Sequence, residues 1–223
     1  MITDTEEGVF TPPQESRASR KMPKRSRASC RGLAAINGRK YVFESMAEFR
    51  TLALSILRPD IEDVWDQPPA VTYLNARGQI KSHTFDFMLK TRAGEQIAVA
   101  VKSYARAVSS NFREELELIG QQLPEGYADE IVLITERDLS KTAATSATRC
   151  LHSTRLTDPE ADNAISSVVS SSAFPTTIER LVEASGLFGR GYRALLRAIA
   201  DGRLVVTNNA SIDYGSTVVR GPV

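Results

Sequence analysis

The sequence from 83 to 102 reads His83-Thr84-Phe85-Asp86-Phe87-Met88-Leu89-Lys90, then Thr91-Arg92-Ala93-Gly94-Glu95-Gln96, then Ile97-Ala98-Val99-Ala100-Val101-Lys102. Two apolar segments flank a polar turn that contains glycine, which is the pattern of a β-hairpin. Alternate residues of a strand share a face, so Asp86 is expected on the face of Met88, and Lys102 on that of Ala100. The pattern predicts that Asp86 and Lys102 meet at one end of the hairpin.

A carboxylate beside a lysine at a strand end is the skeleton of a metal-dependent nuclease site. The acid would hold a divalent cation, and the cation and the lysine would together prepare a water for attack on phosphate. A second acid, Glu48, begins a helix predicted over 45–57, where Ser45 and Glu48 have the spacing of a capping box. A capping glutamate closes its own helix whether or not it binds metal, so both roles stay open for Glu48.

Four segments, in this order, carry a family resemblance. The sequence resembles the PD-(D/E)xK nuclease superfamily, and more closely the TnsA-type endonuclease subunits of heteromeric transposases, over about residues 30–135 with a weaker echo at 176–206. The resemblance implies that Glu48, Asp86 and Lys102 are catalytic, and that Glu48, Asp86 and the Val101 carbonyl bind Mg²⁺ or Mn²⁺. The matching segments are Glu44-Ser45-Met46-Ala47-Glu48, Asp63-Val64-Trp65-Asp66-Gln67-Pro68-Pro69, Ser82-His83-Thr84-Phe85-Asp86-Phe87 and Ala98-Val99-Ala100-Val101-Lys102.

The resemblance also implies an activity and partners. The chain would hydrolyse one DNA strand at a transposon end, together with a DDE-type transposase subunit and an ATPase regulator. It would be a bacterial or phage protein of the cytoplasm, associated with the nucleoid. Two residues depart from the family pattern: Phe85 stands where proline is usual, and Ala100 where a Glu or Gln is usual. Because a methyl group cannot bind metal, a non-catalytic DNA-binding or assembly protein on the same fold is an alternative. A stand-alone restriction or phage nuclease is another.

The N-terminal 30 residues are predicted to be a disordered basic arm. Formal net charge is only +1, but seven cations and no acid lie between Arg17 and Arg31. Such a run is either a solvated tail or a clamp for DNA phosphates. The nuclease-like sequence that follows favours the clamp. The predicted DNA contacts in the arm are Arg20, Lys21, Lys24, Arg25 and Arg27.

Residues 31–138 are predicted to form an α/β core. A strand over 70–74, a helix over 110–123 and a strand over 130–135 follow from apolar spacing and turn residues. Strand, helix and strand in that order indicate a crossover on a mixed sheet flanked by helices, which is the restriction-endonuclease-like architecture.

Residues 139–175 are poor in large apolar groups and are predicted to be a linker or a loosely packed helix. Residues 176–223 then show two short helices, a glycine turn and a closing strand, which predicts a small helical domain of the helix-turn-helix or winged-helix kind. Arg190 and Arg193 are its predicted DNA contacts, although a helical cap with solvated arginines has the same pattern. Cys30 and Cys150 form no C-x-x-C motif, and no apolar run is long enough to predict a membrane span.

Overall fold

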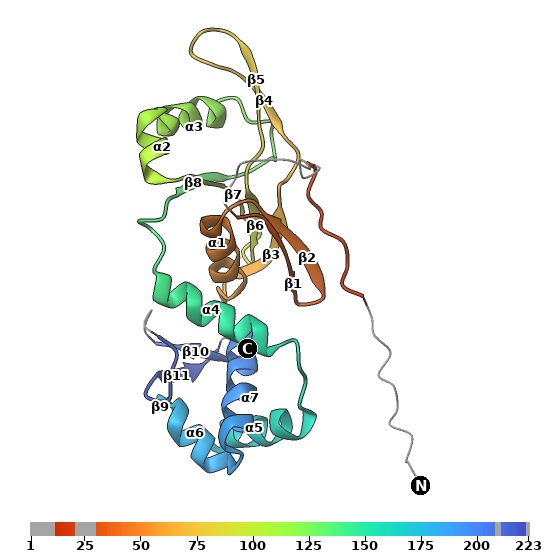
Figure 1. Cartoon of the computed structure of the whole chain (residues 1–223), viewed down its shortest axis with the longest axis vertical. Coiled ribbons are helices and arrows are strands. Elements are labelled where there is room, and N and C mark those ends of the chain that lie inside the picture. Colours follow the sequence, from red (N-terminus) through yellow and green to blue (C-terminus); the bar gives the residue numbers. More distant parts are fainter. Residues whose placement is uncertain (1–11, 21–29, 208–210, 222–223) are drawn as a thin grey trace.

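The computed structural model describes residues 12–20, 30–207 and 211–221. Within these ranges the chain forms an α/β unit and a smaller, mainly helical C-terminal unit (Figure 1). Helix α4 (Lys141–Ser153) runs between them and packs on both α1 and α7. None of the helices in these ranges is long and apolar enough to cross a membrane.

A mixed four-stranded sheet forms the centre of the α/β unit. Its strand order is β3-β6-β7-β8, in which the first two neighbouring pairs are antiparallel and β7 and β8 are parallel. The predicted hairpin is present, with Phe87 opposite Val99, and so is the predicted crossover from β7 to β8. The strands are β3 (Ile61–Asp66), β6 (Phe87–Thr91), β7 (Gln96–Val101) and β8 (Glu130–Ile134).

Helices cover both faces of this sheet, which confirms the predicted α/β class with a mixed sheet flanked by helices. Because side chains alternate along a strand, Phe87 and Leu89 pack on the side of α1, while Met88 packs on the side of α3. Ala98 and Ala100 of β7 join Met88 beneath α3, whereas Val99 faces α1. The helices are α1 (Met46–Ile56), α2 (Tyr104–Ser109) and α3 (Phe112–Gly120).

Two hairpins extend the unit on opposite sides. The β1–β2 hairpin (Gly32–Ile36 and Arg39–Phe43) contributes to the hydrophobic cluster that contains α1. The β4–β5 hairpin (Val71–Leu74 and Ile80–His83) contributes Val71 and Tyr73 to the cluster beneath α3, and its tip projects past that helix (Figure 1). Its turn contains Gly78, whose φ of +69° suits a residue without a Cβ.

The expectation of a disordered arm is wrong for residues 12–20, which lie against the core. Arg17 donates to the Asp63 carboxylate at 2.7 Å, and the Trp65 indole donates to the Arg17 carbonyl at 2.8 Å. Ser16 donates to Asp66, and Ser19 donates to the Gln67 carbonyl at 2.9 Å. Composition and apolar spacing could not predict this attachment, because it consists of polar hydrogen bonds, which leave no periodic apolar pattern in the sequence. The rest of the predicted arm, up to residue 29, lies outside the described residues.

For the segment 139–175, the prediction of a linker is wrong and the alternative of a helix is closer to the structure. Two helices fill most of it, α4 and α5 (Pro159–Ser171), and both have a buried face. That face consists largely of small side chains, which allow close helix packing but produce a weak hydrophobic signal. Cys150 belongs to the C-terminal core and Leu151 to the α1 core, so α4 contributes to both.

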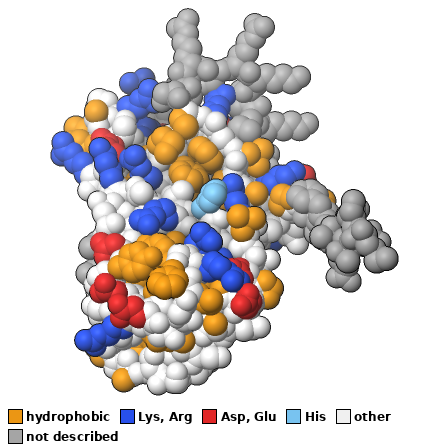
Figure 2. Space-filling view, turned by 60° about the horizontal axis from the view of Figure 1, so that its bottom comes forward, with side chains coloured by type: hydrophobic (Ala, Val, Ile, Leu, Met, Phe, Trp, Pro, Cys, Tyr) orange, Lys and Arg blue, Asp and Glu red, His pale blue; other side chains and the backbone are white. Residues whose placement is uncertain are grey.

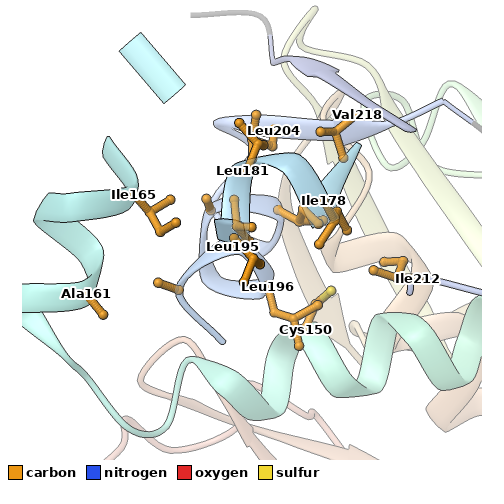
Figure 3. Close-up of a cluster of buried hydrophobic side chains, with 14 residues drawn as sticks. Cys150, Ala161, Ile165, Ile178, Leu181, Leu195, Leu196, Leu204, Ile212 and Val218 are labelled. Atoms are coloured by element: carbon orange, nitrogen blue, oxygen red, sulfur yellow. The ribbon is translucent and has the colours of Figure 1, made fainter. Parts of the chain in front are cut away.

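The C-terminal unit contains the predicted pair of helices and closing strand. Its three-stranded antiparallel sheet has the order β10-β11-β9, and α7 packs against α4, α5 and α6. Leu181, Leu195 and Leu204 meet in its core, beside Ile165 of α5 (Figure 3). The elements are β9 (Thr176–Thr177), α6 (Ile178–Ser185), α7 (Phe188–Ala200), β10 (Leu204–Val206) and β11 (Thr217–Arg220).

Candidate active site

Asp86 lies immediately before β6, where three hydrogen bonds to two backbone segments, β7 and Gln67, hold it. Its N–H donates to the Val99 carbonyl at 2.9 Å, and its carbonyl accepts from the Gln67 N–H at 2.9 Å. Its carboxylate oxygen Oδ2 accepts from the Val101 N–H at 2.6 Å. The carboxylate is therefore fixed at the end of the β6–β7 hairpin, as predicted. Val101 contacts it through its N–H, whereas the sequence resemblance assigns the Val101 carbonyl to a metal.

Glu48 forms the predicted capping box at the start of α1. The Glu48 N–H donates to Ser45 Oγ at 3.1 Å, and Ser45 Oγ donates to Glu48 Oε1 at 2.9 Å. The other oxygen, Oε2, accepts from the Glu44 N–H at 2.5 Å. Glu48 is only 8% exposed, so this cap is buried. An ordinary cap does not need burial, and this one faces the end of the sheet that bears Asp86.

The two carboxylates affect each other. Burial and the nearby charge of Glu48 raise the pKa of Asp86 to about 7, against the opposing effect of the Val101 N–H. Burial likewise raises the pKa of Glu48, against its hydrogen bonds from Glu44 and Ser45. Two carboxylates that repel each other in a buried setting favour a shared proton or a bound cation.

Lys102 lies just beyond β7 and is directed towards α3. Its N–H donates to the Ile134 carbonyl at 3.0 Å, and its Nζ lies 3.5 Å from the centroid of the Phe112 ring. Burial lowers the pKa of Lys102, while the negative charges of Glu115 and, more weakly, Asp86 raise it. No ion pair joins Lys102 to Asp86, although the two charges are near enough to interact. The lysine thus approaches the strand end from the face opposite to Glu48.

Glu115 is a neighbour of Lys102 that the sequence reasoning missed. Phe112 and Glu115 are three residues apart on α3 and therefore share a face. The Tyr73 hydroxyl of β4 donates a hydrogen bond to Glu115, which anchors the carboxylate beside the lysine. The only sequence signal for Glu115 was its helical spacing from Phe112. That spacing did not single out Glu115, because Glu114 and Glu117 are nearby acids on the same helix.

Gln67 adds a strained and buried amide next to Asp86. Its φ of +43° lies in the left-handed region, which is uncommon for a residue with a Cβ. The side chain is 5% exposed, and its Oε1 has no hydrogen-bond partner among the described residues. Strain and an unpaired buried oxygen beside a perturbed carboxylate are typical of functional sites.

The donor set suits a hard cation in part. Among the described residues, no three Asp, Glu, His or Cys side chains converge as a ready metal cage. Magnesium, however, commonly uses one or two carboxylates and completes its shell with water and substrate phosphate. Glu48 and Asp86 supply such a pair, and their mutual repulsion would fall if a cation bound between them. Ala100 adds nothing, because it is 1% exposed and packs beneath α3.

The predicted DNA-binding residues of the arm are described only in part. Arg20 donates to both carboxylate oxygens of Glu44, at 2.7 and 2.9 Å. The guanidinium that was expected to contact DNA is therefore paired with an acid. Glu44 raises the pKa of Asp86 and Arg20 lowers it, so this pair borders the acid site. The other four predicted contacts, Lys21, Lys24, Arg25 and Arg27, lie outside the described residues.

The C-terminal arginines do not form the free cluster that was expected. Arg190 donates to Asp158 at 2.8 Å and to Glu160 at 2.7 Å, whereas Arg193 is exposed and forms no ion pair within the described ranges. Arg197 is 9% exposed and bonds to Asp162 at 2.8 Å. On the face shown in Figure 2, basic side chains lie in separate groups interspersed with acidic and apolar ones.

No protein-family model and no curated protein matches this sequence. The site therefore rests on geometry. The structure brings Glu48 and Asp86 together on one side of the strand end, and Lys102 to the other side. To these it adds Glu115, which the sequence reasoning had not selected, and Gln67.

Proposed function

We propose that this chain is a metal-dependent DNA endonuclease that hydrolyses one strand of a duplex. The observation that carries the proposal is the buried pair of carboxylates, Glu48 and Asp86, at the end of the β6–β7 hairpin, with the pKa of Asp86 raised to about 7 and Lys102 on the other side of the same strand end. The order of elements supports it. A helix, antiparallel strands, further helices and a parallel fourth strand, with sheet order β3-β6-β7-β8, are what a restriction-endonuclease-like core would require.

Each side chain has a role that follows from its position. Glu48 and Asp86 present carboxylate oxygens, and a Mg²⁺ bound to them would polarise phosphate and lower the pKa of a water. Lys102 carries its ammonium on the opposite side of the strand end, where it can contact a phosphate oxygen and stabilise the charge that develops there. The Phe112 ring lies against that ammonium, Glu115 contributes a nearby negative charge, and the Val101 N–H donates to the Asp86 carboxylate.

The finer assignment is to a TnsA-type subunit that works with a DDE-type transposase subunit and an ATPase regulator. The C-terminal unit supports it, because α5-β9-α6-α7-β10-β11 with sheet order β10-β11-β9 is the element order of a winged helix. Its third helix, α7, packs against α4, α5 and α6 and is poorly placed to enter a DNA groove. This favours contact with a protein partner over groove reading by that unit.

One observation favours the alternative of a non-catalytic DNA-binding or assembly protein. Position 100 is a buried alanine, so the hairpin lacks the carboxylate that the family usually has two residues before the lysine. That protein would bind DNA without cutting it.

The test is nicking of supercoiled plasmid and of end-labelled duplex in Mg²⁺, with and without a DDE-type transposase subunit. Wild type should nick, whereas Asp86→Asn and Lys102→Met should lose at least about 100-fold in rate. Lys90→Met is the matched control, since Lys90 lies on the same hairpin and pairs only with exposed Glu62 at 2.9 Å. Equal nicking by all four proteins would overturn the assignment. DNA binding by wild type without nicking would support the non-catalytic alternative.

A further inference from the structure

The β4–β5 hairpin is a two-stranded ribbon that the rest of the fold holds in one position. Its inner face carries Val71 and Tyr73, which are buried beneath α3. The Gln122 side chain accepts from the Leu74 N–H at 2.9 Å and donates to the Leu74 carbonyl at 3.1 Å, so it pairs with the ribbon as a strand would. An isolated two-stranded ribbon is marginal in water, and these contacts give it a fixed direction.

The tip and outer face of the ribbon are uncovered. Leu74 and Ile80 are cross-strand partners and are 50% and 75% exposed. Residues 71–83 contain Arg77 and Lys81 and no acid. Both cations are exposed, and neither forms an ion pair within the described part of the chain. The ribbon therefore combines an apolar pair with unneutralised positive charge, in contrast to the paired arginines of the C-terminal unit.

The ribbon leads directly into the candidate active site. β5 ends at His83, and Asp86 follows three residues later. At about 3.3 Å per residue, the chain from Ile80 to Asp86 spans at most roughly 20 Å. That length corresponds to about six base pairs of duplex at 3.4 Å each. A DNA strand with a phosphate at Asp86 would pass the ribbon within that distance.

We infer that the β4–β5 ribbon is a DNA-gripping arm that lies along a groove of the duplex about half a turn from the phosphate that is cut. Arg77 and Lys81 contact phosphates, and the Leu74–Ile80 pair rests against sugars and base edges. A two-stranded ribbon fits the major groove of B-DNA, and apolar side chains next to cations are a common way to engage bases. The inference rests on the proposed function for its reference point, the cut phosphate.

The main test is the affinity of the full chain for a labelled 30-base-pair duplex in EDTA, measured across a salt series. Arg77→Ala/Lys81→Ala should weaken binding about 10-fold or more at low salt and reduce the log–log salt slope by roughly 2, since each phosphate contact contributes about 0.9. Lys141→Ala/Arg155→Ala is the charge-matched control on α4 and beyond it, away from the ribbon, and its slope should equal that of wild type. Ile80→Ser should weaken binding with no change in slope.

A footprint gives the position of the contact. On the uncut duplex, the region that Arg77→Ala/Lys81→Ala protects from hydroxyl radicals should be shorter than that of wild type. The protection should be lost on one side, about six base pairs from the cleavage site. The thermal midpoint should be unchanged, because both side chains are exposed. An unchanged salt slope and footprint would overturn the inference, and so would absence of duplex binding by wild type. If only Ile80→Ser has an effect, and only on assembly with a transposase subunit, the ribbon is a protein contact and the inference is wrong.

The inference and the proposed function can fail separately. Ribbon-dependent binding without nicking in Mg²⁺ would contradict the endonuclease function and support the DNA-gripping role of the ribbon. Nicking that depends on Asp86, with a salt slope that is independent of Arg77 and Lys81, would contradict the role of the ribbon and support the endonuclease function.

Discussion

The two units of this protein differ in how their buried charged side chains are paired. In the C-terminal unit, Arg190 and Arg197 each reach a carboxylate at 2.8 Å or less. In the α/β unit, Asp86 and Glu48 are buried near each other, and their pKa values are raised by burial. Neutralised charges stabilise a fold, whereas buried charges held without opposite partners cost stability and are available to a ligand. This contrast supports our proposal that the active site lies in the α/β unit.

The largest effect is expected at Asp86. Asp86→Asn should lower cleavage at least about 100-fold and yet stabilise the protein at pH 8. The sign follows from the raised pKa: in wild type the folded state keeps the proton up to about pH 7, while the unfolded state loses it near pH 4. Wild-type stability therefore falls from pH 4 to pH 7, and asparagine removes that loss.

The measurement is the thermal midpoint of both proteins at pH 5 and pH 8. We expect Asp86→Asn to be higher by roughly 3–8 °C at pH 8 and by less than half of that at pH 5. A lower midpoint at pH 8 would mean that the carboxylate stabilises the fold, and the contrast between the units would disappear.

The second prediction concerns the opposite case, the buried ion pair of the C-terminal unit. Arg197→Met should lower the free energy of unfolding by about 2–4 kcal/mol, because Asp162 and the Leu156 carbonyl lose their donor. Arg203→Met is the control, since its pair with Asp201 is exposed and should contribute less than about 0.5 kcal/mol. Urea unfolding measures both. Equal losses would show that burial does not distinguish these pairs.

The third prediction concerns the acid whose charge raises the pKa of Lys102. Glu115→Gln should lower the cleavage rate about 10-fold with little change in KM, because the nearby negative charge that favours the ammonium is lost but substrate contacts stay. In a Lys102→Met background the same change should have no further effect, and a double-mutant cycle measures this coupling. Glu115→Asp should recover part of the rate. Additive losses would mean that Glu115 acts independently of Lys102.

The smallest effect is expected at Asp158. Arg190 and the Ala161 N–H hold the pKa of Asp158 well below its ordinary value. Its stabilising contribution is therefore present above about pH 4 and is lost as the pH falls through the lower folded-state pKa. Asp158→Asn keeps a good helix cap. Its thermal midpoint should lie slightly below wild type at pH 7, and the gap should close towards pH 2 and in 0.5 M salt.

Local pattern was sufficient for much of the fold. The hairpin around Gly94, the capping box at Ser45 and the crossover to β8 each depend on residues close in sequence, and each is present. The attachment of the arm and the close packing of the 139–175 segment were not predicted, for one shared reason. Their attachments are long-range, through Arg17 to Asp63 and through the small face of α4, and composition cannot register such partners.

By itself the sequence determined the strand ends that carry Asp86 and Lys102 and the helix start that carries Glu48, because periodicity and caps act within a few residues. Only the tertiary structure decided that Glu48 is buried next to Asp86, and that Glu115 rather than Asp86 is the main opposing charge for Lys102. The physical reason is that burial and charge proximity depend on how α1 and α3 pack on the two faces of the sheet. Residues far apart in the chain set those distances.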